Sequence, residues 1–304
     1  MGNFFKGLVI SGPTGVGKTD MSVTLAKEIK ADIISADSVQ IYRKMDIGTA
    51  KITSQEMQGI KHHMLDIVEP DEDYSVGDFE KKASEILKEK EKNGENIMIV
   101  GGTGLYIKAL TDGFSVLPPK DSKIRKNLEE KSLQELAQQL KKLDEKAFNE
   151  ININNRIRIV RAIEVCILTG KKFSKLKTEN IKNNNYNFLK IFLTRNREEI
   201  YDRINRRVDM MIRGGLEKEV RRIYNEYSHS RHKITAIGYK EFFDYFDGSI
   251  SFEKAVEEIK KESRRYAKRQ LTWFRKEKDY TIYNLSEKSE QEVIKEIFEK
   301  WKKF

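Results

Sequence analysis

The chain has 304 residues, of which 38% are hydrophobic and 10% aromatic, enough apolar surface to bury a core and to exclude wholesale disorder. Lys and Arg total 58 against 48 Asp and Glu, a formal net charge of +10, which indicates either a polyanionic partner or a lysine-rich solvated surface. The only cysteine, Cys166, excludes an intramolecular disulfide and a thiolate zinc cluster, and without a membrane-spanning apolar run or a signal peptide we expect a cytoplasmic protein with no membrane partner.

The first third of the chain alternates short apolar strands with helices. We expect strands at Gly7–Ile10, Asp32–Ala36 and Ile97–Val100, and helices at Thr19–Ile29 and from Ser75 to about Lys92. Ser75 begins a capping box, and Gly94 closes the helix. Strands that alternate with helices in this way are typical of a parallel sheet.

The pattern changes after Pro118–Pro119. From about Asp121 to Lys175 it is helical, an asparagine-rich stretch follows at Asn183–Asn185, and Phe188–Leu193 indicates another buried strand. We therefore predict an α/β fold: a P-loop NTPase-like parallel-sheet core with a helical insertion domain and a helical C-terminal region. The predicted parts are 1–115 (first part of the core), 116–186 (helical insertion) and 187–304 (core completion and basic helices).

A glycine-rich turn between the first strand and the first helix fits the pattern G-x-x-x-x-G-K-[ST]. Its residues are Gly12, Pro13, Thr14, Gly15, Val16, Gly17, Lys18 and Thr19. In such a P-loop the backbone N–H groups surround phosphate oxygens, the lysine adds a positive charge and the hydroxyl can ligate Mg²⁺. Because the strand and helix contexts are both present, we interpret the turn as a phosphate site, with Thr19 as the metal ligand, rather than a chance glycine turn.

Asp37 follows the second strand directly, so in a parallel sheet it lies at the carboxyl edge beside the P-loop. Its carboxylate could ligate Mg²⁺, act as a general base, or only cap the segment Ser38–Tyr42. A Walker-type NTPase usually ends another strand in a metal-binding acid, but the third strand runs into Gly101–Gly104, which contains no acid. This disfavours ATP hydrolysis.

Several further segments resemble signature stretches of the tRNA dimethylallyltransferases, also called isopentenyl-tRNA transferases. They are 37–51 (DSVQIYRKMDIGTAK), 62–66 (HHMLD), 101–106 (GGTGLY), 161–165 (RAIEV), 236–241 (AIGYKE) and 266–275 (YAKRQLTWFR). With the P-loop, the matches run in order from residue 12 to residue 275. Because the chain ends soon after Trp273, we expect the bacterial form, without the zinc finger of eukaryotic members.

The resemblance implies a reaction. A dimethylallyl group moves from dimethylallyl diphosphate to N6 of the adenosine on the 3′ side of the anticodon, in tRNAs that read codons beginning with U, and diphosphate leaves. The P-loop then holds the prenyl diphosphate rather than ATP, with Mg²⁺ as cofactor. By motif position, Asp37 matches the general base, Thr103 a residue of the reaction channel, and Arg207 an arginine that contacts the diphosphate.

The resemblance and the basic run Arg264–Gln270 also imply contacts with the tRNA anticodon stem-loop. The expected tRNA-contacting residues are Asp37, Ser38, Val39, Gln40, Thr103, Arg125, Arg156, Ile157, Arg158, Ile159, Val160 and Arg269. The chain departs from the family pattern at Asn155, where Asp is frequent, and at Ile157, where Gln is common. We expect a monomer, because nothing in the sequence indicates an obligate partner.

Three alternative functions stay open at this stage. A nucleoside or nucleotide kinase would share the P-loop sheet and would consume ATP. A prenyltransferase acting on a free adenine nucleotide would need no large basic surface. An ATP-switched RNA-binding protein without catalysis would keep its function after Asp37 is replaced.

Overall fold

The computed structural model describes residues 5–113, 115, 117–179 and 186–304. The asparagine-rich stretch Asn183–Asn185 lies outside these residues. The chain divides into two compact units, one formed by Met1–Thr111 with Asn185–Phe304 and the other by Asp112–Asn184. The second unit lies close to the limits expected for the helical insertion, 116–186.

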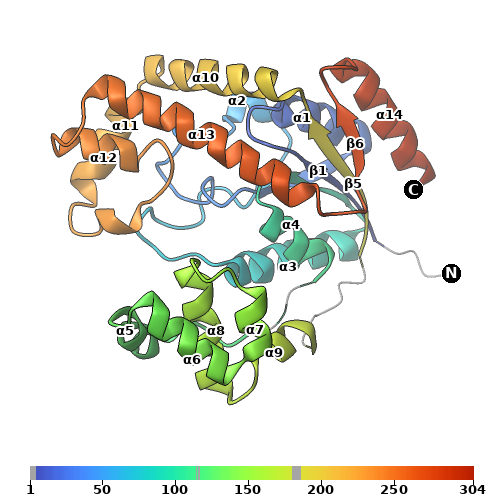
Figure 1. The fold of residues 1–304 in the computed structure, drawn as a ribbon. Helices are drawn as coiled ribbons and strands as arrows, with labels where there is room; N and C mark the ends of the chain where they lie inside the picture. The colour runs from blue at the N-terminus through green and yellow to red at the C-terminus, as the bar shows by residue number, and fades with distance from the viewer. Residues whose placement is uncertain (1–4, 114, 116, 180–185) are drawn as a thin grey trace. The chain divides into compact units, whose positions relative to one another are not determined.

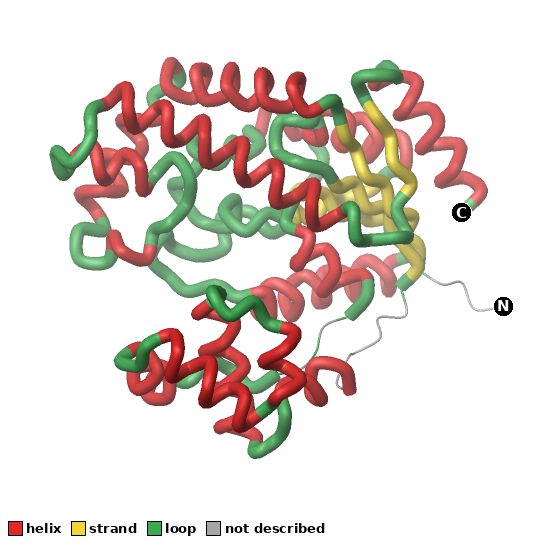
Figure 2. The backbone as a smooth tube through the Cα atoms, in the orientation of Figure 1, coloured by secondary structure: helices red, strands yellow, loops and turns green. Residues whose placement is uncertain are grey.

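The larger unit contains one six-stranded sheet, flanked by helices (Figures 1 and 2). Its strand order is β3-β2-β4-β1-β5-β6, and every pairing is parallel. The strands are β1 (Lys6–Ser11), β2 (Ala31–Ala36), β3 (His62–His63), β4 (Asn96–Gly101), β5 (Asn187–Thr194) and β6 (Thr281–Asn284). The predicted parallel sheet is confirmed, but the edge strand β6 was missed in a region that we expected to be helical.

Helices cover both faces of this sheet because neighbouring strand residues point to opposite sides. On one face, Leu8 and Ile10 pack with α1 (Lys18–Ile29) and α14 (Glu290–Lys303). On the other, Val9 packs with α3 (Val76–Asn93) and α4 (Gly104–Thr111). The expected capping box at Ser75 is formed, and Ser289 forms another at the start of α14.

The C-terminal helices form a separate hydrophobic cluster in the larger unit. They are α10 (Arg197–Arg213), α11 (Leu216–Glu226), the 3₁₀ turn η1 (Arg231–Lys233), α12 (Lys240–Phe246) and α13 (Phe252–Phe274). The side chain of Met45, from the long loop after β2, is buried in this cluster beside Tyr239 and Phe242. The loop after β2, which includes the short helix α2 (Ser54–Met57), is thereby attached to the C-terminal helices.

The secondary-structure elements of the smaller unit are helices, joined by loops, within its described residues. Its helices are α5 (Ser122–Glu129), α6 (Leu133–Leu143), α7 (Glu145–Glu150), α8 (Arg156–Thr169) and α9 (Phe173–Glu179). Asp121, Ser132 and Asn155 cap helix N-termini with their side chains, and Leu136 and Leu140 pack against α8 in the core. Across the described parts of both units, no helix has the length and apolarity needed to cross a membrane.

Candidate active site

Three loops meet at the carboxyl edge of the sheet because β2, β4 and β1 are neighbours. Ala36 pairs with Gly101, and Ser11 pairs with Gly101 on the other side. The chain leaves these three strands as the loop that begins at Asp37, the Gly101–Gly104 turn and the P-loop. The predicted site residues of the core, which are far apart in the sequence, are therefore brought together at one edge.

The P-loop has the backbone that its glycines allow. Gly15 and Gly17 have φ of 81° and 107°, values that side chains rarely adopt. No side chain caps the N-terminus of α1, so its backbone N–H groups are available to an anion. The Lys18 Nζ donates to the carbonyl oxygens of Gly12 (2.8 Å) and Pro13 (2.9 Å), and so lies across the mouth of the loop.

Charged groups of the site act on one another. Burial lowers the pKa of Lys18 to about 7; the Asp37 carboxylate opposes this shift and the Arg207 guanidinium adds to it. Burial also lowers the pKa of Arg207, again opposed by Asp37. Two partly buried cations beside a single carboxylate form a site that is short of negative charge, as expected where an anion binds.

Helix α10 supplies two arginines to the P-loop. The Arg207 Nη1 donates to the Thr14 Oγ1 at 3.1 Å, and the Arg203 Nε donates to the Gly15 carbonyl at 2.7 Å. Arg207 was predicted from the sequence. Arg203 was not, although its position one turn earlier on the same helix face is a signal that could have indicated it.

Asp37 and Thr103 lie on adjacent loops. The Asp37 Oδ1 accepts from the backbone N–H of Val39 (2.9 Å) and of Gln40 (3.4 Å). The capping role left open above is therefore realised, as a turn that fixes the carboxylate beside Lys18 and Arg207. The Thr103 Oγ1 accepts from the Ser38 backbone N–H at 3.1 Å, which links the Asp37 loop to the Gly101–Gly104 turn.

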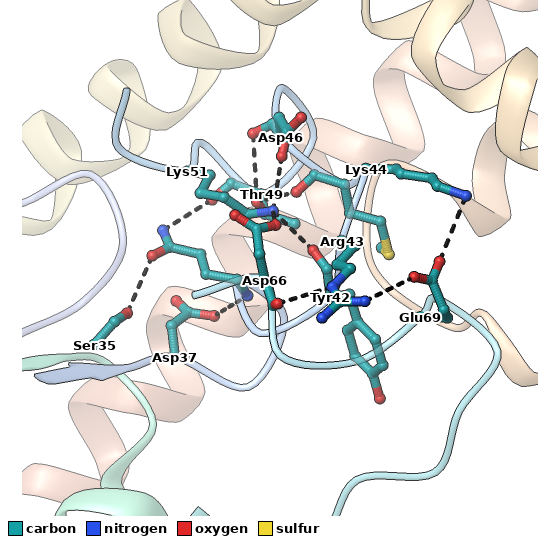
Figure 3. A network of polar contacts seen from close by, with 12 residues as sticks. Ser35, Asp37, Tyr42, Arg43, Lys44, Asp46, Thr49, Lys51, Asp66 and Glu69 are labelled. Carbon is teal, nitrogen blue, oxygen red and sulfur yellow. Dashed lines mark hydrogen bonds and ion pairs between the residues drawn. The ribbon is translucent and has the colours of Figure 1, made fainter. Parts of the chain in front are cut away.

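Polar side chains connect separate parts of the loop after Asp37 with one another and with Asp66 (Figure 3). The Lys51 side chain is only 6% exposed; its Nζ donates to the Tyr42 carbonyl (2.7 Å) and pairs with Asp46 (2.7 Å) and Asp66 (2.6 Å). The Gln40 Nε2 donates to carbonyls at the far end of the same loop. These contacts hold 37–51 as one compact body against the 62–66 segment.

Backbone strain is concentrated in the same place. Of the six described non-glycine residues with positive φ, four lie in or against this loop: Lys44, Ala50, Met64 and Asp66. Such conformations cost of order 1 kcal/mol each and persist only where surrounding contacts impose them. The braces around Lys51 are contacts of that kind.

A second brace comes from α11. The Glu219 Oε2 accepts from the backbone N–H groups of Asp46 (3.1 Å) and Ile47 (2.8 Å), while its Oε1 accepts from the Gly48 N–H (3.0 Å) and the Tyr239 hydroxyl (2.6 Å). Burial, together with the Glu219 carboxylate, raises the pKa of Tyr239, so its hydroxyl stays a donor. No local sequence pattern indicated this role of Glu219.

The residues expected to contact tRNA differ in their surroundings. In the smaller unit, Ile157 and Arg158 are exposed, whereas Ile159 and Val160 are buried in its core, so the last two side chains support α8 instead of facing solvent. Arg156 donates to two carbonyls of α5.

Two further arginines were expected to contact tRNA. Arg125 forms a bidentate pair with the buried Glu164. In the larger unit, the exposed Arg269 lies over the Tyr266 ring, 5.7 Å from its centroid.

Tyr266 is a residue of the site to which the sequence assigned no individual role. Burial raises its pKa to about 12 and the nearby Asp37 adds to this shift, whereas hydrogen bonds with Thr103 and Ser38 oppose it. Its neutral hydroxyl therefore lies between the two loops that carry the predicted base and channel residues.

Among the described residues, no cluster of three or more His, Cys, Asp or Glu side chains could hold a metal ion. Thr19 is exposed at the start of α1. The Thr19 hydroxyl has the position of the P-loop hydroxyl that ligates Mg²⁺, so it would fit the ion as one of its ligands.

The comparisons with known proteins agree with this arrangement. The model of the IPP transferase family matches residues 40–277, more than half of the chain. The chain belongs to this family. Among its relatives is the tRNA dimethylallyltransferase of Fusobacterium nucleatum subsp. nucleatum, 52% identical over 96% of each chain. That of Bacillus subtilis (strain 168) is 42% identical over 96% of this chain and 95% of its own.

Solved structures of the IPP transferase family share the fold. The full-length tRNA isopentenylpyrophosphate transferase of Bacillus halodurans is similar with a TM-score of 0.73 and 42% identity, over 97% of this chain and 94% of that one. A eukaryotic dimethylallyltransferase acting on tRNA has a TM-score of 0.83 at 27% identity, over 95% of this chain and 78% of its own. The predicted family and fold class are confirmed.

Proposed function

We propose that this chain is a tRNA dimethylallyltransferase, which transfers the dimethylallyl group of dimethylallyl diphosphate to tRNA. The observation that carries this proposal is the meeting of three loops at one sheet edge. The P-loop with Lys18 and Arg207 can hold a diphosphate, and the Asp37 carboxylate lies beside it. Family membership supplies the nature of the substrates.

Prenyl transfer to adenine requires a base and a group of positive charges that stabilises the leaving diphosphate. The adenine N6 amine is a poor nucleophile because its lone pair is delocalised into the ring. As N6 bonds to the allylic carbon, the carbon–oxygen bond to the diphosphate breaks, and Asp37 takes the N6 proton. The released electron pair stays on the diphosphate, stabilised by P-loop N–H groups, Lys18 and Arg207.

Mg²⁺ completes the diphosphate site in this proposal. Thr19 is the residue that would hold it, and when bound the ion would neutralise charge on the leaving diphosphate. The Lys18 ammonium and the two α10 arginines provide positive charge at the same place from the protein itself.

The acceptor is the adenosine on the 3′ side of the anticodon in tRNAs that read codons beginning with U. That base must leave its stack to reach the sheet edge, at a cost of a few kcal/mol. Exposed residues such as Arg158 and Arg269 would contact the anticodon stem-loop. We further propose that the protein acts as a monomer in the cytoplasm.

Labelled dimethylallyl diphosphate and unmodified tRNA test the proposal, with Asp37→Asn as the variant. Asn can still accept the Val39 N–H and keep the turn but cannot take a proton. We expect transfer to fall by about 10²- to 10⁴-fold with tRNA affinity unchanged, while Asn at the exposed Asp279 leaves transfer intact.

Three other results would contradict parts of this proposal. Equal transfer by wild type and Asp37→Asn would remove Asp37 as the base. No incorporation into tRNA, with ATP consumed instead, would favour a kinase. Transfer to free adenine nucleotides but not to tRNA would leave a prenyltransferase with a different acceptor.

A further inference from the structure

Helix α13 places one stripe of side chains against the loops of the active site. Tyr266, Gln270 and Trp273 are spaced i, i+4 and i+7 and so share a helix face. The Tyr266 hydroxyl lies near Ser38 and Thr103, which lower its pKa against the effect of burial. Gln270 and Trp273 lie against Gly102 and Gly104 of the neighbouring turn.

Gln270 joins two loops with the two ends of its amide. Its Oε1 accepts from the Thr14 backbone N–H in the P-loop at 2.9 Å, and its Nε2 donates to the Gly102 carbonyl at 3.0 Å. The side chain is buried, with 6% of the residue exposed. A buried amide with both ends bonded is held in one orientation and fixes its partners in turn.

The approach of α13 is so close that the turn must be glycine. A Cβ at Gly102 would overlap the Gln270 amide and press on the Gly12 carbonyl, and a Cβ at Gly104 would overlap the Trp273 ring. The Gly101–Gly104 turn and the P-loop therefore have no freedom to separate or approach without moving Gln270.

We propose that Gln270 is a positioning residue for prenyl transfer, which sets the spacing between the diphosphate-binding P-loop and the turn that carries Thr103. The inference rests on the proposed function. Thr14 is held twice, through its N–H by Gln270 and through its hydroxyl by Arg207. Donor and acceptor must approach to about 3 to 3.5 Å, and a displacement of about 1 Å can cost about 10²-fold in rate.

Gln270→Glu is the variant that tests this. It has the same shape and keeps the acceptor for the Thr14 N–H, but places a carboxylate oxygen against the Gly102 carbonyl and so pushes the turn away. We expect kcat for transfer to tRNA to fall by about 30- to 100-fold. In Gln270→Met, which adds no charge beside the diphosphate, the KM for dimethylallyl diphosphate and the Kd for tRNA change by less than about threefold, because Lys18, Arg207 and the tRNA-facing surface are untouched.

A readout besides kcat separates positioning from simple loss of folded protein. In a misaligned site, water attacks the allylic carbon instead of N6; the carbon–oxygen bond breaks, the water oxygen bonds to carbon and its proton is released, giving dimethylallyl alcohol and diphosphate. We expect the ratio of alcohol to prenylated tRNA to rise in Gln270→Glu and in Gln270→Met, whereas partial unfolding lowers both products together.

Glu257→Gln provides the matched control, because it makes the reverse change at an exposed position of the same helix. It should leave kcat and the product ratio as in wild type. A wild-type kcat and product ratio in Gln270→Glu would overturn the inference while leaving the proposed function standing. Failure of the wild-type protein to prenylate tRNA would instead overturn the proposed function.

Discussion

Burial in the P-loop strongly lowers the pKa of Lys18. With its pKa lowered to about 7 by burial, about half of the empty sites carry a neutral lysine near pH 7. A bound diphosphate favours the ammonium form and raises the pKa. Above pH 7, binding therefore takes up a proton, and affinity falls as pH rises from about 7 towards 9. Calorimetry with an unreactive thio-analogue of dimethylallyl diphosphate, in buffers of different ionisation enthalpy, measures this uptake.

Lys18→Met is the control for that measurement, since the ligand's own phosphates can also titrate. The variant should bind weakly and lose the uptake at pH 8 that belongs to the lysine. Without ligand, the positive charge of Lys18 has the opposite effect: it lowers the stability of the protein instead of raising affinity. A folded-state pKa below the usual 10.5 means that charged Lys18 destabilises the fold, most of all below pH 7. Lys18→Met should accordingly melt higher than wild type at pH 6; equal proton uptake in both proteins would contradict this account.

The loop from Asp37 to Lys51 is the element on which the site depends. Its strained backbone is held by Lys51 from within and by Glu219 from α11. In Glu219→Gln an NH₂ group replaces one of the two oxygens that accept the N–H groups of 46–48. We expect a loss of about 1 to 3 kcal/mol of unfolding free energy, because partly buried N–H donors or the buried Tyr239 hydroxyl are left without an acceptor. Urea unfolding measures this loss.

The neighbouring Glu217 is a matched control for the same helix. It forms an exposed pair with Arg221 at 2.8 Å, so Glu217→Gln should change stability by less than about 1 kcal/mol. If both variants unfold alike, Glu219 does not brace the loop. If Glu219→Gln is less stable but transfers prenyl groups at the wild-type kcat, the brace serves stability alone.

At the scale of the whole molecule, the two compact units have separate cores. In the smaller unit, burial alone would raise the pKa of Glu164, but hydrogen bonds from Arg125 and Arg161 outweigh it and bring the pKa down to about 2. Glu164→Gln breaks this buried network and should destabilise the unit by about 3 kcal/mol. Hydrogen exchange should then accelerate in α5, α6 and α8 but not in β1 or α1.

Two comparisons complete that experiment. Glu150→Gln removes an exposed pair with Lys177 in the same unit and should leave exchange unchanged. Because the Glu164 pKa lies below its usual value, its contribution is present above about pH 4.5 and is lost as pH falls towards 2. Exchange that accelerates equally in both units would mean that they unfold as one.

Much of this protein could be predicted from local patterns in the sequence. The P-loop, the strands β1, β2, β4 and β5 and the cap at Ser75 depend on neighbouring residues, so spacing and residue type were sufficient. The position of Asp37 beside the P-loop also followed, because parallel strands end at the same sheet edge; Thr103 was assigned by family resemblance. The roles of Arg207 and of the tRNA-facing residues came from family resemblance, and those roles stay predictions.

What only the tertiary structure decided lies in contacts between distant segments. The strand β6 is short and forms because β5 offers an edge, which no local pattern indicates. Glu219 meets the Asp46–Gly48 backbone across more than 170 residues, and Gln270 meets Thr14 across 256. The burial of Ile159 and Val160 depends on which face of α8 packs inward. A sequence pattern specifies what a segment can form, but its partners are chosen by the packing of the whole chain.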